Sequence, residues 1–265
     1  MKLLAIDMDG TCLDPHSRTT DSTLEALRMA ADSNILIVPT TGRALSCLPH
    51  QLIEESFYRY VITSNGAQVT DLQTNATIFQ ALIPRLVAQE LLHSCHSLKL
   101  GLTAHIHQEY LLQGRLLALL GRIFYKKDAR KALCVKDLAH IVKTTSYDIE
   151  ELQFYFFSSS ASSRLKEILA SYPQLLAAYT GSYVEIFSQN ASKGNALAAL
   201  AAHLHIPTSQ IACIGDGEND LSMFQSSGLR FAMGNAVPAL KEKADHILPS
   251  NGQEGVAHAI RKYLL

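Results

Sequence analysis

The sequence lacks three features that would point to particular classes of protein: a basic excess, a membrane-length apolar run and paired cysteines. Its 265 residues include 23 Lys and Arg against 24 Asp and Glu, a formal net charge of -1. Nucleic-acid binders normally carry a basic surplus, so we expect no nucleic-acid partner. No apolar stretch reaches the roughly 20 residues that cross a bilayer. The first residues turn acidic at Asp7, too early for a secretory signal. We therefore expect a cytoplasmic protein without a membrane partner.

The five cysteines exclude two further classes of protein. Their number is odd, and no two of them form a C-x-x-C pair. Neither a disulfide framework nor a zinc knuckle is therefore expected, and reduced thiols agree with a cytoplasmic location. Apolar residues, in contrast, make up 48% of the chain, which is enough to bury a sizeable core.

Short β-branched or aromatic runs alternate with helical patterns at both ends of the chain. In the first part, the predicted strands are 3–6, 35–38 and 60–63, and the predicted helices are 23–31 and 46–57. In the last part, the predicted helices are 192–205 and 253–263, and the predicted strands are 211–214 and 229–233. A further helix is expected after the strand at 211–214. This repetition predicts an α/β fold with a doubly wound, mostly parallel sheet of the Rossmann type.

The middle of the chain follows a different pattern. Its predicted helices are 86–98 and 163–172, and its predicted strands are 153–157 and 183–187. None of the motifs described below falls in this section. We therefore expect a smaller α+β domain at 83–187, inserted into a core domain formed by 1–82 and 188–265.

The first motif is the run Asp7-Met8-Asp9-Gly10-Thr11, directly after the first predicted strand. Side chains alternate along a strand, so we expect Asp7 and Asp9 to share one face. Carboxylates at the carboxyl end of a parallel strand lie where such folds build their sites. A D-x-D-G-T match arises by chance in roughly one of several hundred chains of this length, so an acidic turn without function is the weaker interpretation.

Two shorter segments carry chemistry that suits a phosphate group. Thr41-Gly42 follows the second predicted strand, where a hydroxyl beside a glycine turn can bind a phosphate oxygen or simply cap a helix. Lys193 lies in the first turn of the helix that Ser192 caps. A cation there opposes the helix dipole, so it either faces a negative partner or is screened by water. Taken alone, each segment favours the ordinary structural interpretation.

The fourth motif is the run Gly215-Asp216-Gly217-Glu218-Asn219-Asp220. Asp216 ends a predicted strand, and Asp220 lies one helical turn further if a helix starts at once. Carboxylates clustered at the end of a strand are ligands for a hard cation. The alternative is a polar loop with a capping aspartate, which the two glycines and three acids of this short run make the weaker interpretation.

Together the four motifs resemble those of the haloacid dehalogenase-like superfamily, and in particular its Cof-type sugar-phosphatase branch. The resemblance covers the whole chain, and Ser64-Asn65-Gly66-Ala67 also resembles a segment of this branch. Members place an α/β cap between the second and third motifs, where the insertion is predicted here. Cys12 departs from the aliphatic residue that is usual beside the first motif.

The resemblance implies a Mg²⁺-dependent phosphatase that acts on a small phosphorylated metabolite, such as a sugar phosphate, pyridoxal phosphate or flavin mononucleotide. It implies Asp7 as the nucleophile and Asp9 as the general acid and base. The residues implied in binding the phosphoryl group are Thr41, Gly42, Lys193 and Asn219. The implied metal ligands are the side chains of Asp7 and Asp216 and the backbone carbonyl of Asp9. Asp220 is expected to orient Lys193 or a metal-bound water, and the protein to be a monomer or weak homodimer.

Two other functions use the same motifs. A phosphotransferase or phosphomutase would form the same aspartyl-phosphate and deliver it to a sugar hydroxyl, and the motifs do not separate it from a phosphatase. A non-catalytic sensor of phosphorylated metabolites is disfavoured, because binding alone needs no acid–base carboxylate at Asp9.

Two pairs of histidines and one basic stretch are weaker signals. His93 with His96, and His105 with His107, have no evident third ligand nearby, so polar positions in a helix and a strand are the favoured interpretation. The basic stretch at 115–136 favours a solvated helix face over a surface that attracts anionic substrates.

Overall fold

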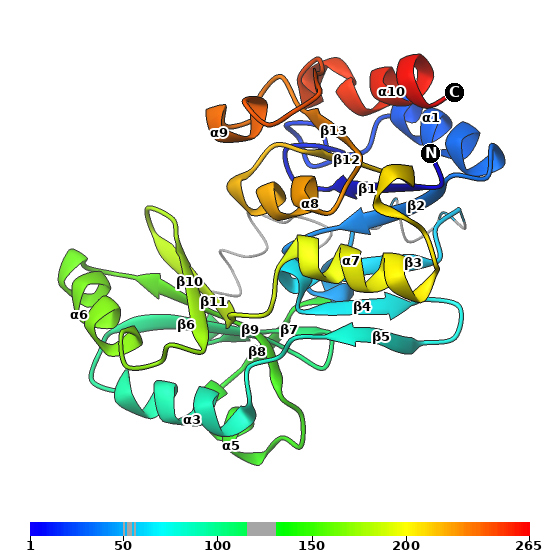
Figure 1. Ribbon diagram of the computed structural model, residues 1–265. Coiled ribbons are helices and arrows are strands. Elements are labelled where there is room, and N and C mark those ends of the chain that lie inside the picture. The colour runs from blue at the N-terminus through cyan, green and yellow to red at the C-terminus, as the bar shows by residue number, and fades with distance from the viewer. Residues whose placement is uncertain (50, 52–54, 56, 116–130) are drawn as a thin grey trace. The chain divides into compact units, whose positions relative to one another are not determined.

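The larger sheet has eight strands among the residues that the computed structural model describes, 1–49, 51, 55, 57–115 and 131–265. Its strands are β1 (Leu3–Asp7), β2 (Leu36–Thr40), β3 (Tyr60–Thr63), β4 (Gln68–Asp71), β5 (Ala76–Gln80), β12 (Ile211–Gly215), β13 (Leu229–Ala232) and β14 (His246–Ile247). They lie in the order β14-β13-β12-β1-β2-β3-β4-β5 (Figure 1). Neighbours from β14 to β3 are parallel, which confirms the predicted α/β fold with a mostly parallel sheet.

Strands β4 and β5 extend this sheet through two antiparallel pairings that the sequence did not predict. All four residues of β4 are buried, although three of them are polar. Polar side chains in a buried strand break the apolar pattern by which strands are recognised. Gln68 Nε2 donates to Thr70 Oγ1 at 3.2 Å, and Arg59 pairs with Asp71, so these polar groups are satisfied within the protein.

Helices cover both faces of this sheet (Figure 1). They are α1 (Asp21–Asp32), α7 (Lys193–His203), α8 (Leu221–Gln225), α9 (Pro238–Lys241) and α10 (Gly255–Ala259). Helix α1 packs with α10, whereas α7 packs with α8. Ser192 caps α7 as predicted, and its Oγ accepts from the N–H of Asn195 at 3.0 Å. The chain leaves β1 toward β2 and leaves β12 toward β13, in opposite directions, so the strand order reverses between β1 and β12.

Two predicted helices differ from the structure. The start of the predicted helix at 46–57 belongs to a 3₁₀ turn, Leu45–Cys47, whereas Gln51 is α-helical, and residues 50, 52–54 and 56 lie outside the described chain. The predicted helix at 253–263 is broken into a 3₁₀ turn (Asn251–Gln253), α10 and a π-helical turn (Ile260–Leu264). The break falls at Glu254, whose φ of 59° is left-handed and interrupts a right-handed helix.

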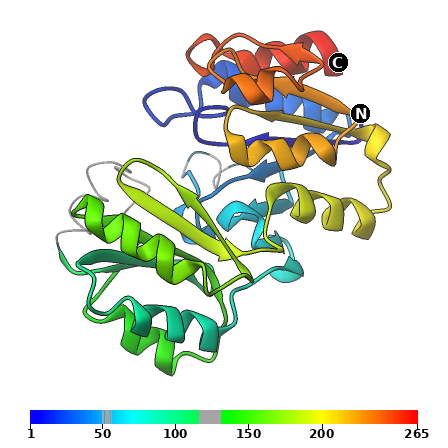
Figure 2. The same ribbon diagram turned by 60° about the vertical axis from the view of Figure 1, so that its left-hand side comes forward.

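The smaller sheet has six strands in the order β10-β11-β9-β6-β7-β8. Its strands are β6 (Leu100–Ile106), β7 (Glu109–Gln113), β8 (Leu133–Val135), β9 (Ile149–Phe156), β10 (Leu175–Tyr179) and β11 (Tyr183–Ser188), and its helices are α3 (Arg85–Ser94), α5 (Leu138–Thr144) and α6 (Ser159–Leu169). All pairings are antiparallel except that of β7 with β8. Figures 1 and 2 show the three helices on one face of this mixed sheet.

The chain forms two compact units, and each sheet belongs to one of them. The first unit comprises 1–42, 49–80 and 192–265, and the second comprises 43–48 and 81–191. The short segment 43–48 belongs with the second unit because the N–H of Ser46 donates to the carbonyl of Gln108 at 3.0 Å, and Ser46 Oγ accepts from the N–H of Tyr110 at 3.2 Å. Within the described chain, we find no helix with the length and apolar character needed to cross a membrane.

The two faces of the smaller sheet differ in chemistry. Leu152 and Phe154 of β9 lie in an apolar core with the helices. The alternate residue Gln153 is also buried, but on the opposite face, where its Oε1 accepts from Thr103 Oγ1 and from Tyr110 OH, both at 3.1 Å. Gln153 Nε2 donates to Glu151 Oε1 at 2.7 Å. This face is therefore a buried polar network organised around one amide.

Candidate active site

Asp7 and Asp216 come to the same edge of the larger sheet. Asp7 is the last residue of β1 and is 6% exposed, and Asp216 directly follows β12. These two strands are parallel neighbours, with Ile6 opposite Ile214, so their carboxyl ends coincide. The edge is also the point where the strand order reverses, which is where open α/β sheets bind ligands.

Lys193 joins the first, third and fourth motifs. Its Nζ donates to Asp7 Oδ1 at 2.5 Å and to Asp220 Oδ1 at 2.6 Å, and the lysine is only 1% exposed. Burial by itself would lower the pKa of this ammonium, yet the carboxylates of Asp220 and Asp7 hold the pKa above its ordinary value. The lysine is therefore a fixed, buried cation, and its two partners offset the unfavourable position in the first turn of α7.

Asp220 is fully buried behind this lysine. While Oδ1 accepts from Lys193, Oδ2 accepts from the backbone N–H of Asp216 at 2.8 Å and of Gly217 at 3.0 Å. The 3₁₀ turn Glu218–Asp220 brings the carboxylate back to these amides. Asp220 thus holds both Lys193 and the loop that carries Asp216.

Three carboxylates form the cluster that could hold a metal ion. Asp7, Asp216 and Asp220 each offer an oxygen, and these oxygens all lie within 4.8 Å of one another. Burial raises the pKa of Asp7 and of Asp216. Carboxylates in such proximity repel one another, so a hard cation, which prefers oxygen ligands, fits this donor set. Asp220 is fully buried and accepts from Lys193 and from two backbone amides, whereas Asp216 is only half-buried, so Asp7 and Asp216 are the better direct ligands.

Asp9 differs from Asp7 in its surroundings. Strand β1 ends at Asp7, and Asp9 is exposed, beyond the strand, in a bridge with Leu13. Because the strand ends at Asp7, alternation along a strand does not reach Asp9, and the expectation that the two aspartates share one face stays a prediction. The side chain of Asp9 is not in the acidic cluster of the described residues. Its catalytic role and that of its carbonyl stay predictions.

Thr41, Gly42 and Asn219 meet at Asn65. Thr41 is buried and follows Thr40, which lies opposite Asp7 in the sheet. Its carbonyl accepts from the N–H of Asn65 at 3.1 Å. A Cβ on Gly42 would lie 3.0 Å from Asn65 Oδ1, and the same oxygen accepts from Asn219 Nδ2 at 3.0 Å. The structure thus brings these predicted residues together through an asparagine.

Three polar residues of this edge were not given a role from the sequence: Thr11, Asn65 and Asn235. Thr11 Oγ1 donates to Asp216 Oδ1 at 2.8 Å, and Asn235 Nδ2 donates to the carbonyl of Gly10 at 2.8 Å. The sequence did mark Asn65 as part of a segment that resembles one of the Cof-type branch. The long-range bonds of these three residues, however, depend on strand order, which a local pattern does not contain.

The weaker signals of the sequence do not join this site. His93 and His96 stack on each other with ring centres 5.5 Å apart, and no histidine is among the metal-holding group found in the described residues. His105 is buried, which lowers its pKa to about 3. Residues 116–130, most of the basic stretch, lie outside the described chain.

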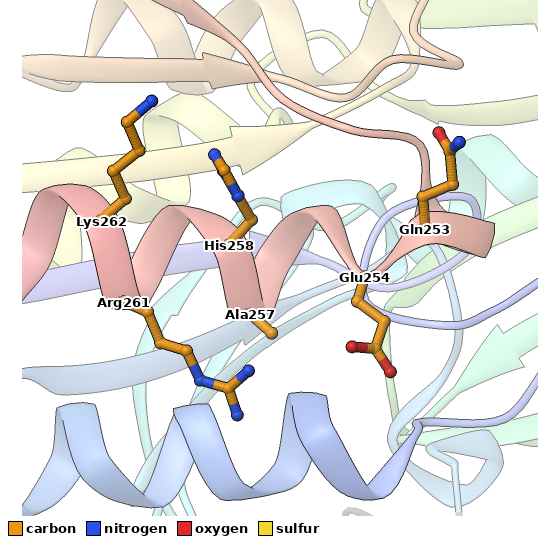
Figure 3. A pocket seen from close by; sticks show the side chains of 6 residues that line it. All are labelled: Gln253, Glu254, Ala257, His258, Arg261 and Lys262. Atoms are coloured by element: carbon orange, nitrogen blue, oxygen red, sulfur yellow. The ribbon is translucent and has the colours of Figure 1, made fainter.

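A separate hollow lies along the end of the chain (Figure 3). Its lining residues are Gln253, Glu254, Ala257, His258, Arg261 and Lys262. Arg261 forms an ion pair with Glu25 of α1, in which Arg261 Nη2 donates to Glu25 Oε2 at 2.9 Å. None of the predicted site residues lines this hollow.

Comparison with known proteins identifies the family of this chain. The chain matches the haloacid dehalogenase-like hydrolase family over residues 4–260. It is 30% identical over 286 residues to the 5-amino-6-(5-phospho-D-ribitylamino)uracil phosphatase YwtE of Bacillus subtilis, covering 100% of this chain and 98% of the relative. It is 28% identical over 273 residues to the HMP-PP phosphatase of Klebsiella pneumoniae, covering 99% and 96%. A solved haloacid dehalogenase-like hydrolase from B. subtilis matches with a TM-score of 0.86 at 25% identity, covering 99% of this chain and 100% of that chain.

The acids and the buried lysine lie where the strand order of the sheet reverses, which is where α/β enzymes bind their ligands. A buried cation at this place suits an enzyme that acts on an anionic group. The chain belongs to the haloacid dehalogenase-like hydrolases. Within that family it is a phosphatase, like the relatives that match it along their whole length. The resemblance drawn from the four motifs is confirmed.

Proposed function

We propose that the protein hydrolyses the phosphate monoester of a small metabolite through an aspartyl-phosphate on Asp7, with Mg²⁺ as cofactor. The observation that carries this proposal is the position of Lys193, whose Nζ lies 2.5 Å from Asp7 Oδ1 and 2.6 Å from Asp220 Oδ1. A buried cation beside the carboxylate is suited to hold an anionic phosphoryl group next to an anionic nucleophile.

In the first step, an oxygen of Asp7 attacks phosphorus in line. The bond from Asp7 Oδ to phosphorus forms while the bond from phosphorus to the leaving oxygen breaks. Asp9, in its protonated form, gives its proton to that leaving oxygen. Thr41 and Lys193 donate to the phosphoryl oxygens, where charge accumulates in the transition state.

In the second step, water releases the phosphate. Asp9, now a carboxylate, takes a proton from the water molecule. The water oxygen attacks phosphorus, the bond to Asp7 Oδ breaks, and inorganic phosphate leaves. Asp7 is then a carboxylate and Asp9 carries the proton again, so the enzyme is ready for another turnover.

Asp7 and Asp216 would hold the Mg²⁺, with the backbone carbonyl of Asp9 as a further ligand. When bound, the ion cancels the repulsion between the anionic nucleophile and the anionic phosphate. Asp220 keeps its hydrogen bonds to Lys193 and to the Asp216 loop, and so positions the lysine. Burial raises the pKa of Asp7, and a cation next to it keeps the carboxylate in the ionised form that attacks.

The substrate is a sugar phosphate or a phosphorylated cofactor or its precursor. The support is that YwtE is named for a phosphorylated ribitylaminouracil, and the Klebsiella relative for HMP-PP. These relatives match the chain along its length but differ in substrate, so the family alone does not select one. We propose that residues 83–187, which carry none of the four motifs, supply the selection.

The test is a panel of phosphorylated metabolites incubated with Mg²⁺, with release of inorganic phosphate as the readout. Wild-type enzyme should turn over at least one metabolite, and EDTA should stop turnover until Mg²⁺ is restored. Asp7→Asn should stay folded and lose turnover by a factor of about 10³ or more, since the nucleophile is gone. Full turnover by freshly purified Asp7→Asn, or an unchanged rate after exhaustive chelation, would contradict the proposal.

The same panel separates hydrolysis from its two alternatives. If a sugar hydroxyl is the acceptor, the dephosphorylated product forms faster than inorganic phosphate, and a phosphorylated sugar accumulates. If the protein is a sensor, one metabolite binds tightly and none is turned over. Phosphate released in step with product supports hydrolysis.

A further inference from the structure

Asn235 is an exposed residue whose side-chain amide is nevertheless fully engaged. It lies in the turn after β13, far along the chain from the first motif. Its Nδ2 donates to the carbonyl of Gly10 at 2.8 Å and lies 3.4 Å from Asp216 Oδ2. Its Oδ1 accepts from the backbone N–H of Asn251 at 2.9 Å. One side chain therefore connects the loops of the first and fourth motifs.

The orientation of this amide is fixed by its partners. A backbone N–H can only donate and a backbone carbonyl can only accept. Asn251 therefore requires Oδ1 on its side of the Asn235 amide, and Gly10 requires Nδ2 on the other side. Asn251 in turn donates from its own Nδ2 to the carbonyl of Leu13 at 2.8 Å. The two asparagines thus hold the loop of the first motif at Gly10 and at Leu13.

The same loop is in close contact with Asp216. Thr11 Oγ1 donates to Asp216 Oδ1 at 2.8 Å. A Cβ on Gly10 would come within 2.3 Å of Asp216 Oδ2, so the glycine backbone lies directly against that oxygen. Any shift of Gly10 would therefore move the Asp216 carboxylate or leave a gap behind it. Asn235 Nδ2 contacts both partners of this contact, the carbonyl of Gly10 and Oδ2 of Asp216.

We propose that Asn235 is a positioning residue for the metal site, which sets the orientation of Asp216 through its contact with Oδ2 and through the carbonyl of Gly10, and that Asn251 holds Asn235 in place. The inference rests on the proposed function, because it assigns Asp216 as a metal ligand. Groups that hydrogen-bond to a ligand fix its rotamer before the ion arrives, and losing such a group typically weakens metal binding by about 10- to 100-fold.

The test measures Mg²⁺ binding by isothermal titration calorimetry on the full-length protein without substrate. Asn235→Ala should weaken binding by about 10- to 100-fold. At saturating Mg²⁺ the kcat should recover toward the wild-type value, because Asn235 does not touch the reacting atoms. Lys241→Met is the matched control, because Lys241 Nζ donates at 2.7 Å to the carbonyl of Gly234, the residue before Asn235 in the same turn. This control should change the affinity by less than a factor of two.

Asp216→Asn separates the failure of this inference from that of the proposed function. If Asp216→Asn binds Mg²⁺ as tightly as wild type, or wild type does not bind it, the metal assignment fails and this inference with it. If Asp216→Asn loses affinity while Asn235→Ala keeps it within a factor of two, only the positioning role is overturned. Equal losses in Asn235→Ala and Lys241→Met would also overturn it, since they would show a general effect of the turn.

Discussion

The two units bury polar side chains in different ways. In the first unit, the buried polar groups at the sheet edge are charged: Lys193 donates to Asp7 and to Asp220 where β1 and β12 end. In the second unit, the polar groups lie within the strands and centre on the amide of Gln153, which accepts from the hydroxyls of Thr103 and Tyr110 and donates to the buried Glu151. In the first unit, charged side chains cluster at one edge of the sheet. In the second unit, hydrogen bonds link polar side chains along one face of the sheet.

This difference has energetic consequences. A buried charge that loses its partner costs several kcal/mol, because no water replaces the partner. A buried neutral group that loses one of several hydrogen bonds costs about 1–3 kcal/mol. The first unit should therefore respond sharply to single changes at its sheet edge, in activity as well as in stability. Single substitutions in the polar network of the second unit should lower the free energy of unfolding moderately.

The largest effect is expected from Lys193→Met. This change removes the cation between Asp7 and Asp220 and the donor to the phosphoryl group, so kcat should fall by about 10²- to 10³-fold. The free energy of unfolding, measured by urea titration without metal, should fall by about 3–5 kcal/mol, since two buried carboxylates lose their partner. Lys166→Met is the control in the second unit, where Lys166 Nζ lies over the ring of Tyr179. A kcat within tenfold of wild type for Lys193→Met would contradict the charged arrangement proposed for the first unit.

The same contrast explains how much of the site could be predicted. The charged residues of the first unit follow strand ends and stand in short runs with glycine, so Asp7, Lys193, Asp216 and Asp220 were identified from the sequence. The proximity of Asp7 and Asp216 required only that parallel strands end at one edge, whereas the contacts of Lys193 with Asp7 and Asp220 also depend on where α7 packs. Asn235 was not identified, because its bond to Gly10 depends on which strands are neighbours and no local spacing encodes that.

The fold shows the same limit. Parallel strands such as β1 and β12 are apolar up to their last residue and were predicted within a residue or two. β4 was missed because its buried residues are mostly polar, and its partners lie within the sheet. The polar face around Gln153 was not predicted either, since alternate polar residues in a strand normally indicate exposure to water. Whether that face is buried depends on the packing of the folded chain, which the local residue pattern does not contain.

A smaller effect comes from two glycines with the same backbone conformation. Gly10 has φ +88° and Gly114 has φ +86°, so alanine costs about 1–2 kcal/mol of backbone strain at either position. A Cβ on Gly10 would lie 2.3 Å from Asp216 Oδ2, whereas a Cβ on Gly114 meets no atom of the described residues within 4 Å. Gly10→Ala should therefore also displace Asp216, and a shift of about 1 Å in such a group costs about 10²-fold in rate.

The measurement for this pair is kcat/KM together with the midpoint of thermal unfolding. Both variants should unfold at a similarly lowered temperature, while only Gly10→Ala should lose activity. If Gly114→Ala loses as much activity as Gly10→Ala, backbone strain and not displacement of Asp216 is responsible, and the sensitivity assigned to the edge of the first sheet is wrong.

The smallest effect concerns His105, a buried group of the second unit that titrates. Burial lowers its pKa from 6.5 to about 3, and its ring packs edge-on against Tyr110. Below pH 6.5 the unfolded chain binds a proton that the folded chain refuses, so stability is lost as the pH falls from 6.5 toward 3. Between pH 7 and pH 5, His105 should lower the free energy of unfolding by about 2 kcal/mol.

His105→Gln removes this proton-binding group, so its free energy of unfolding should fall by about 2 kcal/mol less than that of wild type between pH 7 and pH 5. Urea titrations at the two pH values measure the difference, and groups such as Asp7 cancel because they are common to both proteins. His93→Gln, which changes an exposed histidine of α3 in the same unit, is the control and should follow the wild-type curve. If His105→Gln follows it too, the folded protein binds a proton at His105 already between pH 7 and pH 5, and the burial of this ring in its neutral form is wrong.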